Sequence, residues 1–184
     1  MRIIGGELRG KKLFSPRGRS VRPTADRLRE TIFNIIAAEV PGAVVLDLFA
    51  GTGALGIEAL SRGASSAWFV DRSAAALSLL EKNLSACNLT GRSRRIRWDI
   101  AKSLHCLSDA RPLFTLVFID PPYACGLLSA AMFHLHRTRS TASGALVVIE
   151  HGIDEPLDEP GGAYHIEDRR RYGKSLVSIA RYLV

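Results

Sequence analysis

A short run of polar and rigid residues is the strongest chemical signal in the sequence. Asp120-Pro121-Pro122-Tyr123 directly follows the apolar stretch 116–119. Two consecutive prolines fix the backbone and leave carbonyl groups outside any regular hydrogen-bond pattern. The Asp120 carboxylate and the Pro121 carbonyl can accept the two hydrogens of an amino group, and Tyr123 offers a ring for stacking against a base. We predict that this segment receives the exocyclic amine of a nucleic-acid base.

The amine of guanine or adenine is a poor nucleophile because its lone pair is delocalised into the ring. Acceptors that hold both hydrogens out of the base plane would make the nitrogen pyramidal and aim its lone pair at an electrophile. Positioning and electrostatic preorganisation then carry most of the catalysis. The predicted reaction therefore needs no covalent nucleophile on the protein.

A glycine-rich turn is the second signal. Gly51 and Gly53 remove side chains where a predicted strand gives way to a helix and where a ligand must approach the backbone closely. Asp47 precedes this turn, and Asp71 ends the next predicted strand 20 positions after Gly51. At that spacing a carboxylate can bind both ribose hydroxyls of a nucleotide. The pair predicts a cofactor that contains adenosine, although the glycine pattern alone also suits a dinucleotide.

The elements that position these residues alternate between apolar runs and helical periodicity. This alternation predicts a doubly wound α/β fold of the Rossmann type, with a mostly parallel sheet whose strand ends gather the acidic residues along one edge. The last two strands read as a hairpin around Tyr172-Gly173, so the last strand should insert antiparallel. Strands are predicted at 44–48, 67–71, 96–98, 113–119, 145–150, 164–171 and 176–184, with helices from Pro23 to Pro41-Gly42, at 55–62, at 73–88 and from Gly126.

Length and composition predict one domain. The chain has 184 residues, of which 47% are hydrophobic, enough for a single core. We expect residues 1–184 to form one unit, with a basic arm or hairpin at 1–22 that is too small to hold a core and a catalytic core at 23–184. No apolar run has the length of a signal peptide or a membrane span, so we expect a cytoplasmic protein. We also expect it to act as a monomer.

The charge predicts a polyanionic partner. The formal net charge is +7, and such a surface attracts nucleic acid. Basic residues concentrate in the first thirty positions, through Arg29, and again near the end of the chain. We predict RNA phosphate contacts at Arg17, Arg19, Arg22, Arg169, Arg170, Arg171 and Lys174.

The cysteines and histidines predict no metal site. Cys87, Cys106 and Cys125 lie far apart in the sequence, without the short spacings of a zinc site or a redox pair. His134 and His136 are two positions apart on a predicted helix and should point to different sides. We expect reduced thiols and chemistry that is independent of metal.

Together these motifs resemble a known family. Residues 47–56 with 120–123 are similar to the class I amino-methyltransferases, and residues 2–6 and 22–30 resemble the bacterial RsmD-type enzymes. The resemblance extends from the first residues to the Tyr172-Gly173 turn. It implies S-adenosylmethionine as the cofactor and methylation of a guanine N2 amine in small-subunit (16S) ribosomal RNA. The RNA substrate would be free or within a partly assembled small subunit.

The resemblance also implies roles for residues that match the family's motifs. Asp47, Gly51 and Gly53 would line the methionine side of the cofactor, Asp71 the ribose and Asp99 the adenine amine, while Thr24 and Arg27 would close over the methionine end. The stretch 135–141 departs from the family pattern, since it lacks a Gly-rich or Pro-containing approach to the fifth strand.

Several other functions stay open at this stage. A DNA or RNA adenine-N6 methyltransferase shares the 120–123 motif, and a non-catalytic RNA-binding factor for ribosome assembly could share the fold. A base C5-methyltransferase would need a cysteine nucleophile, for which Cys125 is the candidate, but no proline precedes it. An NAD(P)-dependent oxidoreductase would use the glycine turn and leave residues 120–123 unexplained.

Overall fold

The computed structural model describes the whole chain except residues 17–22, 123–125 and 158–161 and the side chains of residues 23–25. Seven strands form one sheet in the order β3-β2-β1-β4-β5-β7-β6. Only the pairings of β7, with β5 and with β6, are antiparallel. The strands are β1 Val44–Leu48, β2 Ser66–Asp71, β3 Ser93–Arg97, β4 Phe114–Ile119, β5 Thr141–Gly152, β6 Tyr164–Tyr172 and β7 Ser175–Tyr182.

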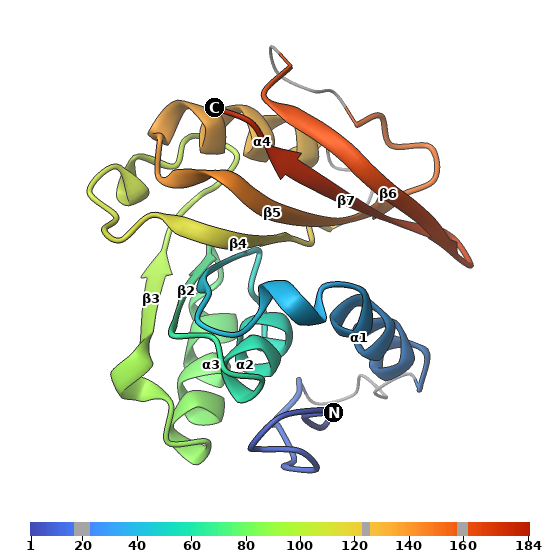
Figure 1. Cartoon of the computed structure of the whole chain (residues 1–184). Helices are drawn as coiled ribbons and strands as arrows, with labels where there is room; N and C mark the ends of the chain where they lie inside the picture. The colour runs from blue at the N-terminus through green and yellow to red at the C-terminus, as the bar shows by residue number, and fades with distance from the viewer. Residues whose placement is uncertain (17–22, 123–125, 158–161) are drawn as a thin grey trace.

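Helices cover both faces of this sheet (Figure 1). One face packs against α1 (Pro23–Ile35), α2 (Ala54–Ser61) and α3 (Ala74–Ala86), and the other against α4 (Leu127–Thr138). Short 3-10 helices occur at Ala37–Glu39, Thr90–Arg92 and His105–Leu107. The predicted doubly wound, Rossmann-like fold with an antiparallel last strand is confirmed.

The two central strands explain why the sheet lies inside the molecule. All five residues of β1 are buried, and β4 is buried at every position except Thr115. Parallel strands that are covered on both faces read as continuous apolar runs. Asp47 is the one charged residue of β1, so its carboxylate needs a partner within the protein.

Some element boundaries differ from the sequence prediction. β5 begins at Thr141, four residues before the predicted start, because Thr141 pairs with Phe114 before a register shift brings Leu146 beside Leu116. The first helix ends at Ile35, and a 3-10 helix completes the path to the Pro41-Gly42 turn. Local periodicity does not reveal such irregular joins.

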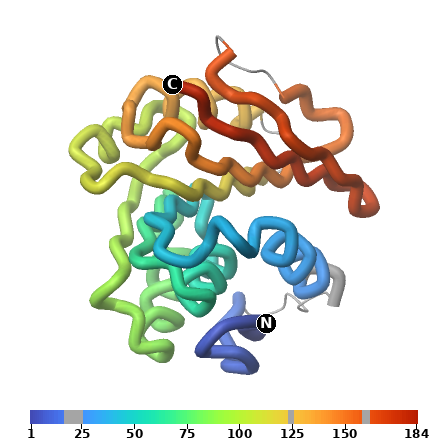
Figure 2. Tube along the Cα trace, in the orientation of Figure 1, coloured from blue at the N-terminus to red at the C-terminus, as the bar shows by residue number. Residues whose placement is uncertain are grey.

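Residues 1–14 fold back as the predicted hairpin, with an isolated antiparallel bridge between Arg2 and Lys12. Ile3 and Leu13 are buried in the same apolar cluster as α1 and α2. The hairpin therefore holds no core of its own but contributes to the main one. Figure 2 shows the N-terminus beside α1 and α2 and the C-terminus far away, on the side of α4.

Candidate active site

A cavity of about 680 Å³ opens at the carboxyl edge of the sheet. Such a volume accommodates a ligand of cofactor size. Its walls combine apolar side chains with four carboxylates. The lining residues are Met1, Leu28, Arg29, Ile32, Phe49, Ala54, Leu55, Asp71, Arg72, Trp98, Asp99, Ile100, Ala101, Asp120, Pro121, Pro122, Leu127, Glu150, Tyr172 and Ser175.

The strand order fixes the sequence of acidic groups along this edge. Asp99 lies just beyond β3, Asp71 ends β2, Asp120 follows β4 and Glu150 lies near the end of β5. Neighbouring strands are about 5 Å apart. The cavity is therefore an elongated trough with Asp99 toward one end and Glu150 toward the other.

Asp120 occupies the position predicted for the amine receptor. Its side chain opens onto the cavity beside Pro121 and Pro122. Desolvation by the surrounding protein raises the pKa of the Asp120 carboxyl to about 7, and the negative charge of Glu150 adds to this effect. The carboxyl is thus poised to hold or release a proton near neutral pH. Tyr123 lies outside the described residues.

Asp71 joins the end of β2 to the glycine-rich turn. Its Oδ2 accepts a hydrogen bond from the Gly51 amide at 2.9 Å, and its Oδ1 accepts one from the Ser73 amide at 2.8 Å. Each carboxylate oxygen has a second lone pair that can accept from a ligand hydroxyl. Asp71 is therefore held in place and can still bind a ribose.

Asp47 lies beneath the glycine-rich turn and does not line the cavity. Its buried Oδ2 accepts a hydrogen bond from the Gly56 amide at 2.9 Å. Burial, more than the nearby charges of Asp120 and Asp71, raises the pKa of the Asp47 carboxyl well above its usual range. Asp47 thus anchors the first turn of α2 from below. Its predicted contact with a cofactor stays a prediction.

Glycine is required where this turn meets the core. Gly53, with φ 79°, precedes α2, and a Cβ on it would lie 2.3 Å from Leu80 Cδ1. Gly51 also has a positive φ, and its amide is the donor to Asp71. Neither glycine lines the cavity, but both shape the turn that brings Phe49, Ala54 and Leu55 to its wall. Their cofactor contact is likewise untested.

The end of the trough near Asp99 has flat and apolar walls. Trp98 and Ile100 flank Asp99, and all three line the cavity. The indole nitrogen of Trp98 donates to the Ser103 carbonyl at 2.9 Å, which orients the ring. A carboxylate between an indole and an aliphatic chain suits a planar ring that carries an amino group.

Sequence reasoning missed several residues of the cavity. Glu150 ends the predicted strand 145–150. The rule that ligands bind at the carboxyl ends of parallel strands, which located Asp71 and Asp120, would therefore have located Glu150 too. Phe49 lines the cavity with φ 61°, a conformation that only the fold reveals. Met1 and Tyr172 come from opposite ends of the chain, and no local pattern places them together.

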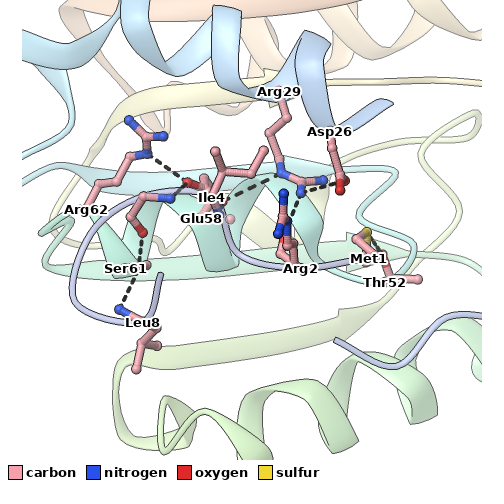
Figure 3. A network of polar contacts seen from close by, with 12 residues as sticks. Met1, Arg2, Ile4, Leu8, Asp26, Arg29, Thr52, Glu58, Ser61 and Arg62 are labelled. Carbon is pink, nitrogen blue, oxygen red and sulfur yellow. Dashed lines mark hydrogen bonds and ion pairs between the residues drawn. The ribbon is translucent and has the colours of Figure 1, made fainter. Parts of the chain in front are cut away.

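A buried ion network holds the hairpin and α1 against α2 (Figure 3). Glu58 is 1% exposed, and its carboxylate accepts from the amides of Ile4 at 2.8 Å and Gly5 at 2.7 Å. It also pairs with Arg62 at 2.8 Å and Arg29 at 3.6 Å. Arg29 was counted among the basic residues of the first thirty positions, but its guanidinium is buried and is not a surface group for RNA.

A second link joins the hairpin to the glycine-rich turn. The buried Asn83 side chain accepts from the Phe14 amide at 2.7 Å and donates to the carbonyls of Phe14 at 3.2 Å and Thr52 at 3.0 Å. One amide group therefore connects three segments that are distant in sequence. The hairpin is part of the frame of the cavity.

The predicted RNA-contacting residues of the last hairpin are exposed. Arg169, Arg170 and Arg171 lie on β6 and Lys174 lies in the β6–β7 turn. Arg170 pairs with Asp168 at 2.7 Å, but this ion pair is solvent-accessible. Arg17, Arg19 and Arg22 lie outside the described residues.

Arg27 lines a separate cavity of about 440 Å³ between α1 and the hairpin. Its predicted place over the methionine end of a cofactor therefore stays a prediction. The Thr24 side chain is not described. Within the described part of the chain, no group of three or more His, Cys, Asp or Glu side chains could hold a metal ion, and no helix is long and apolar enough to cross a membrane.

Comparisons with known proteins identify the family and the relatives of this chain. A family described as conserved hypothetical protein 95 matches residues 1–181. Ribosomal RNA small subunit methyltransferase D of Escherichia coli (strain K12) is 38% identical over 157 residues, 85% of this chain and 77% of that protein. YlbH of Bacillus subtilis (strain 168) is 36% identical over 179 residues, 97% of each chain. The solved structure of yhhF from Escherichia coli superposes with a TM-score of 0.86 at 33% identity, covering 100% of this chain and 98% of that one.

Proposed function

Because this chain belongs to the conserved hypothetical protein 95 family, we propose that it is an S-adenosylmethionine-dependent methyltransferase that modifies the N2 amine of a specific guanine in small-subunit ribosomal RNA. The observation that carries the proposal is the position of Asp120 and Pro121 within the same cavity as Asp71 and Asp99. That arrangement combines an amine receptor with a nucleoside site. The similarity to ribosomal RNA small subunit methyltransferase D supports the choice of substrate.

The cavity fits this cofactor in shape and charge. Asp99 with Trp98 would hold the adenine, and Asp71 the ribose. The carboxylates of the trough give it a negative character in a protein whose net charge is +7. A sulfonium cofactor is cationic, whereas RNA is a polyanion, so each would be attracted to a different part of the surface. S-adenosylmethionine would supply the electrophilic methyl group.

The protein's own residues would position the acceptor amine and manage its proton. The Asp120 carboxylate and the Pro121 carbonyl would hold the two amine hydrogens and direct the nitrogen lone pair along the trough. As the new N–C bond forms, the nitrogen becomes acidic and gives up a proton. A carboxylate whose pKa is about 7 can accept that proton and return it to water at neutral pH.

Mass spectrometry of ribosomal RNA from cells with and without the gene tests the proposal directly. We expect one N2-methylguanosine to disappear from small-subunit RNA when the gene is deleted and to return with the purified protein and the methyl donor. Comparison of free RNA with small-subunit particles in the same assay would identify the physical substrate. Loss of an N6-methyladenosine instead would show that the substrate assignment is wrong.

Asp71→Ala should weaken cofactor binding. A ribose held by a carboxylate loses charge-assisted hydrogen bonds worth about 1.5–3 kcal/mol, so we expect a ten- to hundredfold increase in the dissociation constant. Calorimetric titration with S-adenosylmethionine measures it. Asp109→Ala, which removes an exposed carboxylate outside the cavity, serves as the matched control. Equal affinities in the two variants would place the ribose elsewhere.

The rate of methyl transfer should depend on pH through Asp120. Since the pKa of its carboxyl is raised to about 7, the group is protonated below that pH and can accept fewer hydrogen bonds. We expect kcat/KM to fall about tenfold per pH unit below 7 and to level off above it. Asp120→Asn keeps an oxygen acceptor but does not titrate, so its profile should be flat. The same slope in both proteins would assign the pH dependence to another group.

The basic arm should bind RNA through phosphates. Replacing Arg17, Arg19 and Arg22 with alanine removes up to three phosphate contacts, each of which contributes nearly one to the slope of log K against log salt concentration. We expect weaker RNA binding with a flatter salt dependence and an unchanged cofactor affinity. Filter binding from about 50 to 200 mM salt measures the slope. An unaltered slope would mean that these arginines face solvent and make no phosphate contacts.

A further inference from the structure

A second carboxylate stands beside the amine receptor in the cavity. Ile119 of β4 pairs in register with Ile149 of β5, and the residues that come next in the chain are Asp120, just beyond the end of β4, and Glu150 of β5. Both line the cavity. The Glu150 side chain projects toward the α1 face of the sheet, because Val148, two positions earlier on β5, packs on that face.

Two carboxylates in one partly enclosed site repel each other, and the charge of Glu150 does raise the pKa of Asp120. A ligand relieves this repulsion if it places hydrogen-bond donors against both groups. The ligand edge must then carry adjacent N–H groups. An edge that alternates donors with acceptors would satisfy one carboxylate and oppose the other.

Guanine has such an edge, because its N1 carries one hydrogen and the neighbouring N2 carries two. When the N2 hydrogens are donated to Asp120 and Pro121, the N1 hydrogen points to one side of the amine, and a second acceptor there can bind it. We propose that Glu150 accepts this N1–H and thereby selects guanine as the base to be methylated. The inference rests on the proposed function and adds to it a residue that reads the base.

Adenine would be rejected by the same arrangement. Its N6 amine could occupy the receptor, but the flanking ring nitrogens N1 and N7 carry lone pairs and no hydrogen. A lone pair against the Glu150 carboxylate is repulsive, and this contact supplies no hydrogen bond in place of the one that guanine N1–H would donate. Sites built to hydrogen-bond an N–H discriminate strongly against analogues that lack it.

The rest of this end of the trough offers apolar walls to a base turned out of its helix. Tyr172, Leu28 and Ile32 line the cavity on the α1 side of Glu150, and Tyr172 packs against the main apolar cluster. An aromatic ring and two aliphatic side chains form walls that a flat base can contact. Because β5 lies beyond β4 from the cofactor end, the base and the cofactor would meet at Asp120.

The test uses small-subunit RNA in which the mapped target guanine is replaced by 2-aminopurine, ligated from synthetic fragments and presented free and in reconstituted particles. This base keeps the C2 amine but has no hydrogen on N1. It also lacks O6, so 6-thioguanine, which keeps N1–H but lacks O6, controls for that loss. We expect the wild-type protein at pH 7 to prefer guanine over 2-aminopurine by about a hundredfold or more and to accept 6-thioguanine.

Glu150→Gln should collapse this preference to about tenfold or less, because its amide can donate to the bare N1 of 2-aminopurine while it loses the charge-assisted bond to guanine. Glu150→Asp, which keeps the charge, should retain the preference at a lower rate. Asp154→Asn removes an exposed carboxylate outside the cavity and should behave as the wild type. Cofactor titration verifies that each variant is folded.

The outcomes separate this inference from the proposed function. If the wild-type protein methylates guanine N2 and Glu150→Gln retains the full preference for guanine, Glu150 does not read N1 and the proposed function still holds. If the wild-type protein methylates no guanine N2 in any RNA, the proposed function itself fails. A collapsed preference in Glu150→Gln alone, with intact cofactor binding, supports the inference.

Discussion

Asp120→Ala should lower the rate of methyl transfer by a hundredfold or more while the affinity for S-adenosylmethionine changes little. Removing one well-placed hydrogen-bond acceptor from an active site has effects of about this size. Asp120 would act on the amine in the transition state, so its loss should lower kcat and leave cofactor binding intact. Single-turnover transfer to RNA and calorimetric cofactor titration measure the two quantities.

Loss of folding would not explain such a result. The pKa of the Asp120 carboxyl is raised in the folded protein to about 7, so the folded state favours the protonated form. The stability that this preference contributes is lost as pH rises through about 7, where the ionised group disfavours folding. The alanine variant should therefore be at least as stable as the wild type at pH 8.

Cys125→Ala provides the contrasting variant. Direct transfer to nitrogen needs no thiol adduct, so this variant should keep nearly full turnover. An inactive Cys125→Ala together with an active Asp120→Ala would contradict the amine mechanism and favour methylation of a ring carbon.

Glu58→Ala should destabilise the protein by about 3–5 kcal/mol, the range observed when one partner of a buried ion pair is removed. The substitution leaves Arg29, whose side chain is 6% exposed, without its pairing to Glu58, and the amides of Ile4 and Gly5 without an acceptor. For a domain of this size the melting temperature should fall by roughly 10 °C. Urea unfolding and thermal melting, followed by circular dichroism, measure both effects.

Glu81→Ala is the matched control for charge alone. Glu81 pairs with Arg95 at 2.7 Å, but its side chain is 54% exposed. Such surface pairs contribute less than about 1 kcal/mol. If the two glutamate variants lost similar stability, the buried Glu58 network would contribute no more to the free energy of unfolding than an exposed ion pair does.

The sequence predicted the strand ends better than the interior of the site. Asp71 and Asp120 each end or follow an apolar run, Asp99 follows the predicted strand at 96–98, and the parallel topology brings all three to one edge. Asp47 also follows an apolar run, yet its carboxylate lies beneath the glycine-rich turn and accepts a hydrogen bond from the Gly56 amide. Periodicity shows where a strand ends but does not show which partner a side chain finds.

Contacts between distant segments were beyond sequence reasoning. Arg29 looks like one more cation of the basic first thirty residues, but its partner Glu58 is 29 positions further along the chain. Asn83 looks like a polar residue of an amphipathic helix, but it bonds the backbone 69 residues away at Phe14. Only the packing of helices onto the sheet brings these groups together.

The place of β7 between β5 and β6 has a consequence for how the chain folds. Until residues 175–182 are available, the edge of β5 that carries Val147, Val148 and Ile149 has no hydrogen-bonding neighbour. An open apolar edge of this kind can pair with another chain and start aggregation. The sheet thus closes only when a strand from late in the sequence enters its interior, and truncation before Ser175 should yield insoluble protein.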